Sequence, residues 1–164
     1  MEKWKKIKET DELYSVSNYG NIKRHGKSGD YALNGYADGN GYLTFTARVN
    51  GKSKRLMIHR LVAKYFLQKV NGKELVNHID GDKMNAHINN LEWINHRDNL
   101  IHGIKNKRPD KLIGANYNSF YGKWLSRIAK DGKLYDLGKF DTEIEAHQAY
   151  INKAIKLGLS VEYV

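Results

Sequence analysis

Four polar residues in the middle of the chain have the types and spacing needed to cleave a phosphate ester. Asn77 and His78 stand side by side, Asn90 follows twelve residues after His78, and Asn99 lies nine residues further on. The amide oxygens of Asn77 and Asn99 suit a hard cation such as Mg²⁺. His78 titrates near neutrality, so it can take a proton from water at pH 7. A metal ion and a positioned base are together sufficient to hydrolyse a phosphodiester.

A strand–loop–strand–helix segment is needed to bring these residues together. The segments Leu75-Val76-Asn77-His78 and Leu91-Glu92-Trp93-Ile94 predict two short strands, and Asp80-Gly81-Asp82 predicts a turn between them. Asn95 is a good helix N-cap, and the helix that it begins is expected to run to about Gly103. A helix packed on two strands can place Asn99, one turn inside it, opposite a residue of the first strand. The segment therefore predicts one site.

The residues before this segment predict a small antiparallel β module and a helix. Strands are expected at 14–17 and from Ile22, around the turn Asn18-Tyr19-Gly20-Asn21. A second hairpin is expected from 42–49 and 52–58, because Asn50-Gly51 is a strong two-residue turn. The apolar stripe of residues 59–68 has helical spacing.

The residues after the segment predict a separate module. The only proline stands in 105–111, which has no apolar residue and is typical of a linker. Strands at 124–129 and 134–140 flank the hairpin turn Asp131-Gly132. Thr142 and Glu145 form a capping box, and the helix that follows is expected to end at Leu157. We expect a three-stranded sheet with one packed helix.

Charge is distributed unevenly along the chain. The 164 residues include 28 Lys and Arg and 18 Asp and Glu, a net charge of +10. Residues 1–70 hold +8 of it, residues 71–104 hold −2 and residues 105–164 hold +4. Basic flanks around a centre poor in positive charge fit a protein that grips phosphates on both sides of a cation. A solvated basic face that serves only solubility is the alternative.

The lack of cysteine and of long apolar runs excludes several classes of protein. The chain has no cysteine, which excludes disulfides, thiolate zinc sites and cysteine nucleophiles. It has no apolar run long enough for a membrane span, and its N-terminus lacks the apolar stretch of a signal peptide. We expect an intracellular protein that is not secreted and does not act at a membrane.

Three longer motifs carry a resemblance to a known family. Residues 76–85 read V-N-H-I-D-G-D-K-M-N, 88–94 read I-N-N-L-E-W-I, 95–100 read N-H-R-D-N-L, and 58–66 read I-H-R-L-V-A-K-Y-F. Together they resemble the HNH nuclease motif of phage and intron homing endonucleases and the helix that leads into it. Residues 4–24 resemble the small modular DNA-binding motif that precedes such nucleases. I-G-A-N-Y at 113–117, G-K-W at 122–124 and 137–150 resemble the Apetala-type DNA-binding domain.

The resemblance implies a role for each of the four polar residues. His78 falls on the general base, Asn77 on the first metal ligand and Asn99 on the last. Asn90 falls on the asparagine that orients the base through the loop backbone. Many relatives have an acidic residue where Asn77 stands, so Asn77→Asp is expected to preserve or raise activity and to tighten the metal. The implied cofactor is one Mg²⁺ or Mn²⁺ per active site, with no small-molecule cofactor.

The sequence therefore predicts an α+β protein in four parts. These are an N-terminal DNA-binding β module (1–55), a ββα-metal (HNH) nuclease core (56–104), a linker (105–111) and an Apetala-type domain (112–164). The expected partner is double-stranded DNA, cut by a monomer that nicks one strand per active site. The candidate DNA contacts are Lys23, Arg24, Arg48, Lys52, Lys54, Arg55, Lys123, Trp124, Arg127, Lys133, Tyr135 and Lys139.

Two other functions remain open from the sequence. A sequence-specific DNA-binding protein that keeps the hairpin as an inactive scaffold is favoured by the neutral Asn77. A structured-RNA binder is the weaker alternative, because the chain lacks the paired aromatic stacking motif of RNA-recognition sheets.

Overall fold

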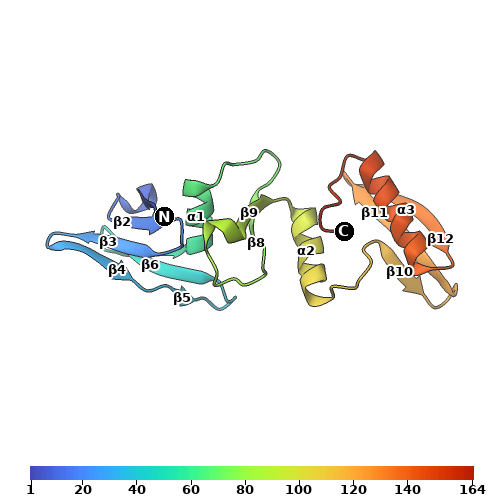
Figure 1. Cartoon of the computed structure of the whole chain (residues 1–164), viewed down its shortest axis with the longest axis horizontal. Helices are drawn as coiled ribbons and strands as arrows, with labels where there is room; N and C mark the ends of the chain where they lie inside the picture. The colour runs from blue at the N-terminus through green and yellow to red at the C-terminus, as the bar shows by residue number, and fades with distance from the viewer. The chain divides into compact units, whose positions relative to one another are not determined.

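The N-terminal strands form two antiparallel sheets. In the computed structural model, which describes all 164 residues, β1 (Trp4–Lys6), β2 (Tyr14–Ser17), β3 (Ile22–Gly26) and β4 (Gly29–Leu33) pair in chain order, with the 3₁₀ helix η1 (Lys8–Thr10) between the first two (Figure 1). The second sheet holds β5 (Tyr36–Ala37), β6 (Leu43–Val49) and β7 (Lys52–Met57). The hairpin predicted at Asn50-Gly51 is confirmed, because both residues have the positive φ (49° and 75°) of a two-residue turn.

A helix and a short hairpin complete this part of the chain. Helix α1 (Ile58–Phe66) follows β7 directly. Strands β8 (Leu75–His78) and β9 (Leu91–Ile94) pair antiparallel, as predicted, and η2 (Ile88–Asn90) ends the loop between them. One hydrophobic core runs through both sheets, α1 and the hairpin; it includes Val16, Phe45, Val62, Ala86 and Leu91.

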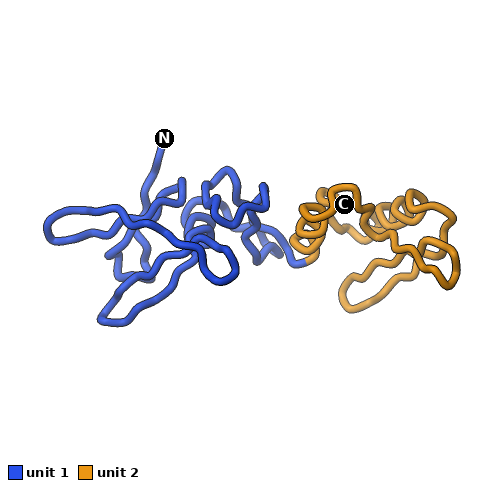
Figure 2. Tube along the Cα trace, turned by 90° about the horizontal axis from the view of Figure 1, so that it is seen from below, with its two compact units in different colours: residues 1–96 blue, residues 97–164 orange.

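The chain divides into two compact units, Met1–His96 and Arg97–Val164 (Figure 2). The predicted border between 55 and 56 falls inside the core of the first unit, because Phe45 and Val62 lie in the same cluster. The division into functional modules stays a prediction.

Helix α2 (His96–Lys107) is longer than the sequence pattern indicated. It continues past Gly103 into the first residues of the predicted linker. Nothing between Gly103 and Lys107 breaks a helix, whereas Pro109 disfavours helical backbone at the residue before it. The connection without helix therefore begins at Arg108.

The second unit has the predicted sheet with one packed helix. Strands β10 (Ala115–Asn118), β11 (Lys123–Lys130) and β12 (Lys133–Phe140) pair antiparallel in chain order, and α3 (Glu143–Lys156) covers one face (Figure 1). The capping box of Thr142 and Glu145 is confirmed. Gly114 has a φ of +84°, and a Cβ there would lie 2.2 Å from the Tyr150 ring, so the close approach of the chain to α3 requires glycine.

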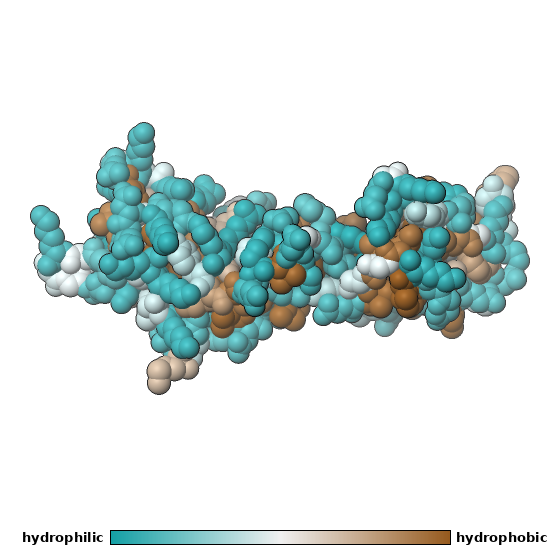
Figure 3. Space-filling model, turned by 90° about the horizontal axis from the view of Figure 1, so that it is seen from above, coloured by the Kyte–Doolittle hydropathy of each residue, from teal (hydrophilic) through white to brown (hydrophobic).

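These elements confirm the α+β class with several small antiparallel sheets. Most of the surface visible in Figure 3 is hydrophilic, as expected for the charge of the chain. None of the helices is long and apolar enough to span a membrane.

Candidate active site

The β8–β9 hairpin buries the two residues that the sequence singled out. Asn77 and His78 end β8, and they are 7% and 4% exposed. Antiparallel pairing sets Asn77 opposite Glu92 and His78 opposite Leu91. The Nε2 atom of His78 is buried and has no hydrogen-bond partner. A buried imidazole nitrogen without a hydrogen-bond partner costs stability.

Three aromatic rings from different segments meet at His78. The His59 ring, from the first turn of α1, lies 4.7 Å from the His78 ring between centroids, and Tyr42 lies 6.0 Å away. Tyr42 also stacks on His59 at 5.0 Å, and the Lys83 ammonium lies over the Tyr42 ring. We call Tyr42, His59 and His78 the ring cluster. It fixes the plane of the His78 imidazole.

Burial favours the neutral form of both histidines. Desolvation, with a smaller contribution from His78, lowers the pKa of His59 to about 3. Desolvation also lowers the pKa of His78, against the opposing fields of Asp80 and Asp82. A neutral imidazole has a lone pair free to accept a proton, so His78 is in the state that a general base requires.

Asn90 holds the loop that follows His78. Its Oδ1 accepts a hydrogen bond from the Asp80 backbone N–H at 3.0 Å, and its Nδ2 donates to the Asp80 carboxylate and the Asn85 carbonyl at 2.8 and 2.9 Å. Burial acts to raise the pKa of Asp80, but hydrogen bonds from Asn85 and Asn90 bring it below its ordinary value. Asn90 is thus tied to the loop at three points, as an orienting residue would be.

Asn77 offers one oxygen to a cation. Its Nδ2 donates to Glu92 Oε1 at 2.8 Å, which leaves the amide oxygen as its other polar atom. Nowhere does the structure gather three or more His, Cys, Asp or Glu side chains into a metal-binding group. A site built on amide oxygens fits Mg²⁺ or Mn²⁺ by ligand type, and its protein ligands carry no formal charge.

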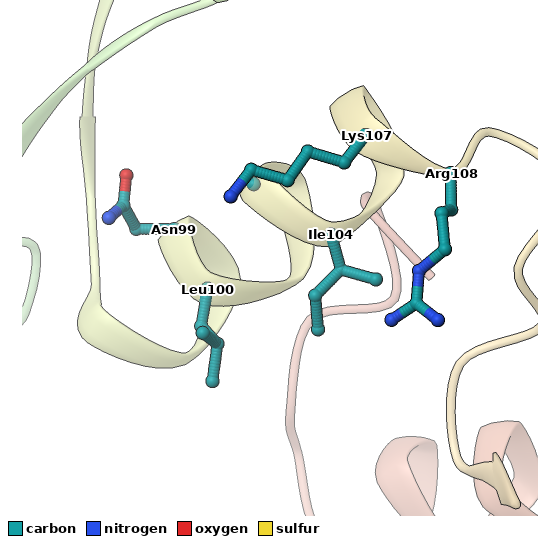
Figure 4. A pocket seen from close by; sticks show the side chains of 6 residues that line it. Asn99, Leu100, Ile104, Lys107 and Arg108 are labelled. Carbon is teal, nitrogen blue, oxygen red and sulfur yellow. The ribbon is translucent and has the colours of Figure 1, made fainter.

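Asn99 lies on α2, in the second unit. It lines a groove of about 380 Å³ together with Leu100, Ile104, Lys107 and Arg108. Figure 4 shows the Lys107 side chain extending back along the helix toward the turn that carries Asn99. Its role as second metal ligand stays a prediction.

The candidate DNA contacts of the first unit fall into two groups. Lys23 is paired with Asp30 at 3.0 Å and lies over the Trp4 ring, and Arg24 donates to the Tyr31 hydroxyl. The hairpin cations are exposed and have no ion pair: Arg48, Lys52, Lys54 and Arg55. The pairing of Thr46 with Arg55 puts Arg55 on the same face as Arg48, while Lys52 and Lys54 lie on the other.

The candidate DNA contacts of the second unit differ in which face of its sheet they occupy. Arg127 and Lys139 lie on the face that α3 leaves uncovered, and Arg127 pairs with Asp136 at 3.4 Å. Tyr135 is opposite the buried Ile128, and the Lys153 ammonium of α3 lies over its ring, so Tyr135 faces the helix.

Three further candidates of the second unit also have partners within the protein. Trp124 lies two residues before the buried Ser126, so both side chains are on the face that α3 covers, and the Trp124 ring meets the Tyr117 ring edge-on at 5.4 Å. Lys133 lies over Tyr135, and Lys123 forms an ion pair with Asp141. The whole set stays a prediction.

Two residues of the site were not found from the sequence. Glu92 could have been found by counting the hairpin register outward from the turn, because it is the direct partner of Asn77. Tyr42 carries no sequence signal, since only the folded sheet brings it to His78.

An antiparallel hairpin with a buried Asn-His pair, followed in the chain by a helix that carries a further asparagine, defines the class of HNH nuclease folds. The protein family described as "NUMOD4 motif" matches residues 2–90, more than half of the chain. DNA endonuclease I-HmuI of Bacillus phage SP01 is 35% identical over 129 residues, which cover 69% of this chain and 73% of that protein. The chain therefore belongs to the NUMOD4 family and, with I-HmuI, to the HNH homing endonucleases.

A solved structure and two further relatives agree with this placement. The structure described as "DNA binding and cleavage by the HNH homing endonuclease I-HmuI" matches 96% of this chain and 84% of that one, with a TM-score of 0.55 and 26% identity. The protein named "Uncharacterized HNH endonuclease L245" of Acanthamoeba polyphaga mimivirus is 40% identical over 63% of the chain, and YosQ of the SPbeta prophage of Bacillus subtilis is 43% identical over 60%. These matches span 30% and 55% of the two relatives.

Proposed function

We propose that the protein is a site-specific DNA endonuclease of the HNH homing type. It hydrolyses a phosphodiester in double-stranded DNA with one divalent cation and His78 as the general base. The observation that carries the proposal is the buried imidazole of His78 beside Asn77, whose Nε2 has no hydrogen-bond partner, held by the ring cluster and by a loop that Asn90 clamps. The names of the relatives support it, since they describe HNH endonucleases.

In this proposal each of these side chains has a part in the reaction. A ring nitrogen of His78 takes a proton from water as the water oxygen bonds to phosphorus, and the bond from phosphorus to the 3′ oxygen breaks. Tyr42 and His59 hold the imidazole in place, and burial keeps it neutral until that moment. Asn77 and Asn99 are the proposed metal ligands. A bound Mg²⁺ or Mn²⁺ supplies positive charge that stabilises the crowded phosphate and the departing oxygen.

Contacts to DNA come from both ends of the chain in this proposal. The exposed hairpin cations meet phosphates, and the Apetala-type domain binds DNA through the uncovered face of its sheet, where Arg127 and Lys139 lie. The protein works inside a host cell as a monomer.

His78→Ala tests the assignment of the base. The variant is expected to bind DNA as well as wild type and to cleave at least ~100-fold more slowly, the usual scale for losing a general base. Conversion of supercoiled plasmid to relaxed or linear forms in Mg²⁺ measures cleavage, with the exposed His96→Ala as the matched control. Cleavage by His78→Ala within a few-fold of wild type refutes the role of His78. A wild-type protein that binds DNA and never cuts it would instead be the inactive scaffold.

The number of DNA strands that the protein cuts in one event should equal its number of active sites. The chain holds one buried Asn-His pair at the end of a strand, because its other Asn-His pair, Asn95-His96, lies at the start of α2 with His96 exposed, so a monomer is expected to nick one strand. A duplex labelled on both strands, cut under single-turnover conditions, distinguishes a nick from a double-strand break. Simultaneous cutting of both strands by a monomer contradicts the proposal.

A further inference from the structure

Strand β9, which pairs with the strand that ends in Asn77 and His78, places the Glu92 carboxylate beside Asn77. Glu92 is the direct cross-strand partner of Asn77 in the β8–β9 hairpin. Its Oε1 accepts a hydrogen bond from Asn77 Nδ2 at 2.8 Å, the one side-chain hydrogen bond that Asn77 makes. Asn77 is buried and Glu92 is half-buried, so water competes only weakly for this bond. The ladder register and the side-chain contact therefore point to the same pair.

A carboxylate beside an asparagine has a specific consequence. The asparagine amide carries an oxygen on one side and an NH₂ group on the other, and a half-turn exchanges them. A carboxylate only accepts hydrogen bonds, so it favours the orientation in which Nδ2 faces it and opposes the one in which two oxygens meet. Oδ1 is then turned away from Glu92.

We propose that Glu92 is a positioning residue that orients Asn77 as a metal ligand and supplies, next to it, the negative charge that an asparagine lacks. The inference rests on the proposed function, in which Asn77 binds the cation. Only the amide oxygen can bind a cation, because the NH₂ group has no lone pair to give. The pair Asn77–Glu92 thus carries one negative charge, as a single aspartate at position 77 would.

The proposal changes what Asn77→Asp should do. By sequence reasoning alone, the added charge tightens the metal. In the structure, an aspartate oxygen would replace Nδ2 about 3 Å from the Glu92 carboxylate, where like charges repel. Asn77→Asp alone should therefore gain little metal affinity. In the double variant Asn77→Asp with Glu92→Gln, a donor again faces an acceptor, because the amide at position 92 now donates to the carboxylate at position 77. The four proteins form a double-mutant cycle.

Two readouts test the proposal with the full-length chain. Without metal or DNA, NMR follows the Asn77 side-chain NH₂ signals, which are assigned by their loss in Asn77→Asp. They should exchange slowly with water in wild type and at least ~tenfold faster in Glu92→Ala, which removes the acceptor. Equal exchange rates in the two proteins would show that the hydrogen bond does not exist in solution and would overturn the proposal.

The second readout is Mn²⁺ affinity for each protein bound to DNA, measured by electron paramagnetic resonance, together with the Mg²⁺ concentration that gives half-maximal cleavage. Glu92→Gln should weaken the metal about fivefold, and the double variant should bind it about tenfold more tightly than Asn77→Asp alone. Glu74→Gln is the matched control, because Glu74 directly precedes β8, the strand that carries Asn77, and pairs with Lys69. A cycle that is additive within twofold overturns the proposal. If wild type cuts no DNA, the proposed function fails, and the NMR and Mn²⁺ measurements still decide the role of Glu92.

Discussion

Acid should destabilise the first unit through His59. This side chain is 3% exposed, its Nδ1 is buried without a hydrogen-bond partner, and burial lowers its pKa from 6.5 to about 3. The unfolded chain therefore binds a proton to His59 at a pH where the folded chain does not. The contribution of His59 to stability is complete above pH 6.5 and is lost as the pH falls toward 3.

The size of the effect follows from the two pKa values. Between them each pH unit removes ~1.4 kcal/mol, so the free energy of unfolding should fall by about 2 kcal/mol between pH 7.5 and pH 5. His78 contributes with the same sign, because its pKa is also lowered. Glu9, whose pKa is lowered to about 2, acts only below its ordinary value of 4.5 and so lies outside this window.

Urea unfolding of His59→Phe measures the effect. The substitution removes the titrating ring and keeps an aromatic side chain against Tyr42. In a Trp124→Phe background the remaining tryptophans, Trp4 and Trp93, report on the first unit alone. The His59→Phe protein should lose about 2 kcal/mol less than its parent between pH 7.5 and pH 5, while the exposed His96→Gln should follow the parent. An unchanged pH dependence in His59→Phe would refute the reasoning, since it would show that His59 carries its proton in the folded state as readily as in the unfolded one.

Two further substitutions test the loop and the second unit. Asn90→Ala removes three hydrogen bonds from the 79–90 loop and should lower the cleavage rate at least ~tenfold with unchanged DNA affinity. The exposed Asn89→Ala should match wild type in a plasmid-nicking assay, and equal cleavage rates for the two variants would show that Asn90 does not hold the loop. Thr142→Ala removes the N-cap of α3 and should lower the free energy of unfolding of the second unit by ~1 kcal/mol, measured by urea with tryptophan fluorescence against the exposed Ser119→Ala; no difference between these two would contradict the capping argument.

Features set by adjacent residues could be predicted from the sequence. The turns at Asn50-Gly51 and Asp131-Gly132, the strands 75–78 and 91–94 and the capping box at Thr142 all lie where the pattern placed them. Each depends on side chains within a few residues of one another, so local chemistry decides it.

Features that depend on distant residues could not be predicted. Strand β4 is almost wholly exposed, with no alternation to mark it, and it forms because β3 offers an edge. The ring cluster joins residues 42, 59 and 78, which no spacing rule connects. The effect of Asn77→Asp was predicted without Glu92, because the repulsion appears only when the two strands are in register.

The ring cluster itself indicates that this hairpin is more than a scaffold. Two of the buried polar atoms that lack a partner, His59 Nδ1 and His78 Nε2, belong to rings that lie 4.7 Å apart. Each unsatisfied group costs ~1–3 kcal/mol, and apolar rings of similar shape would avoid that cost. A cluster that served packing alone would therefore be more stable with phenylalanine at either position. Stability and activity should respond in opposite directions to such changes at His78, because the imidazole that costs stability is the group that the proposed general base requires.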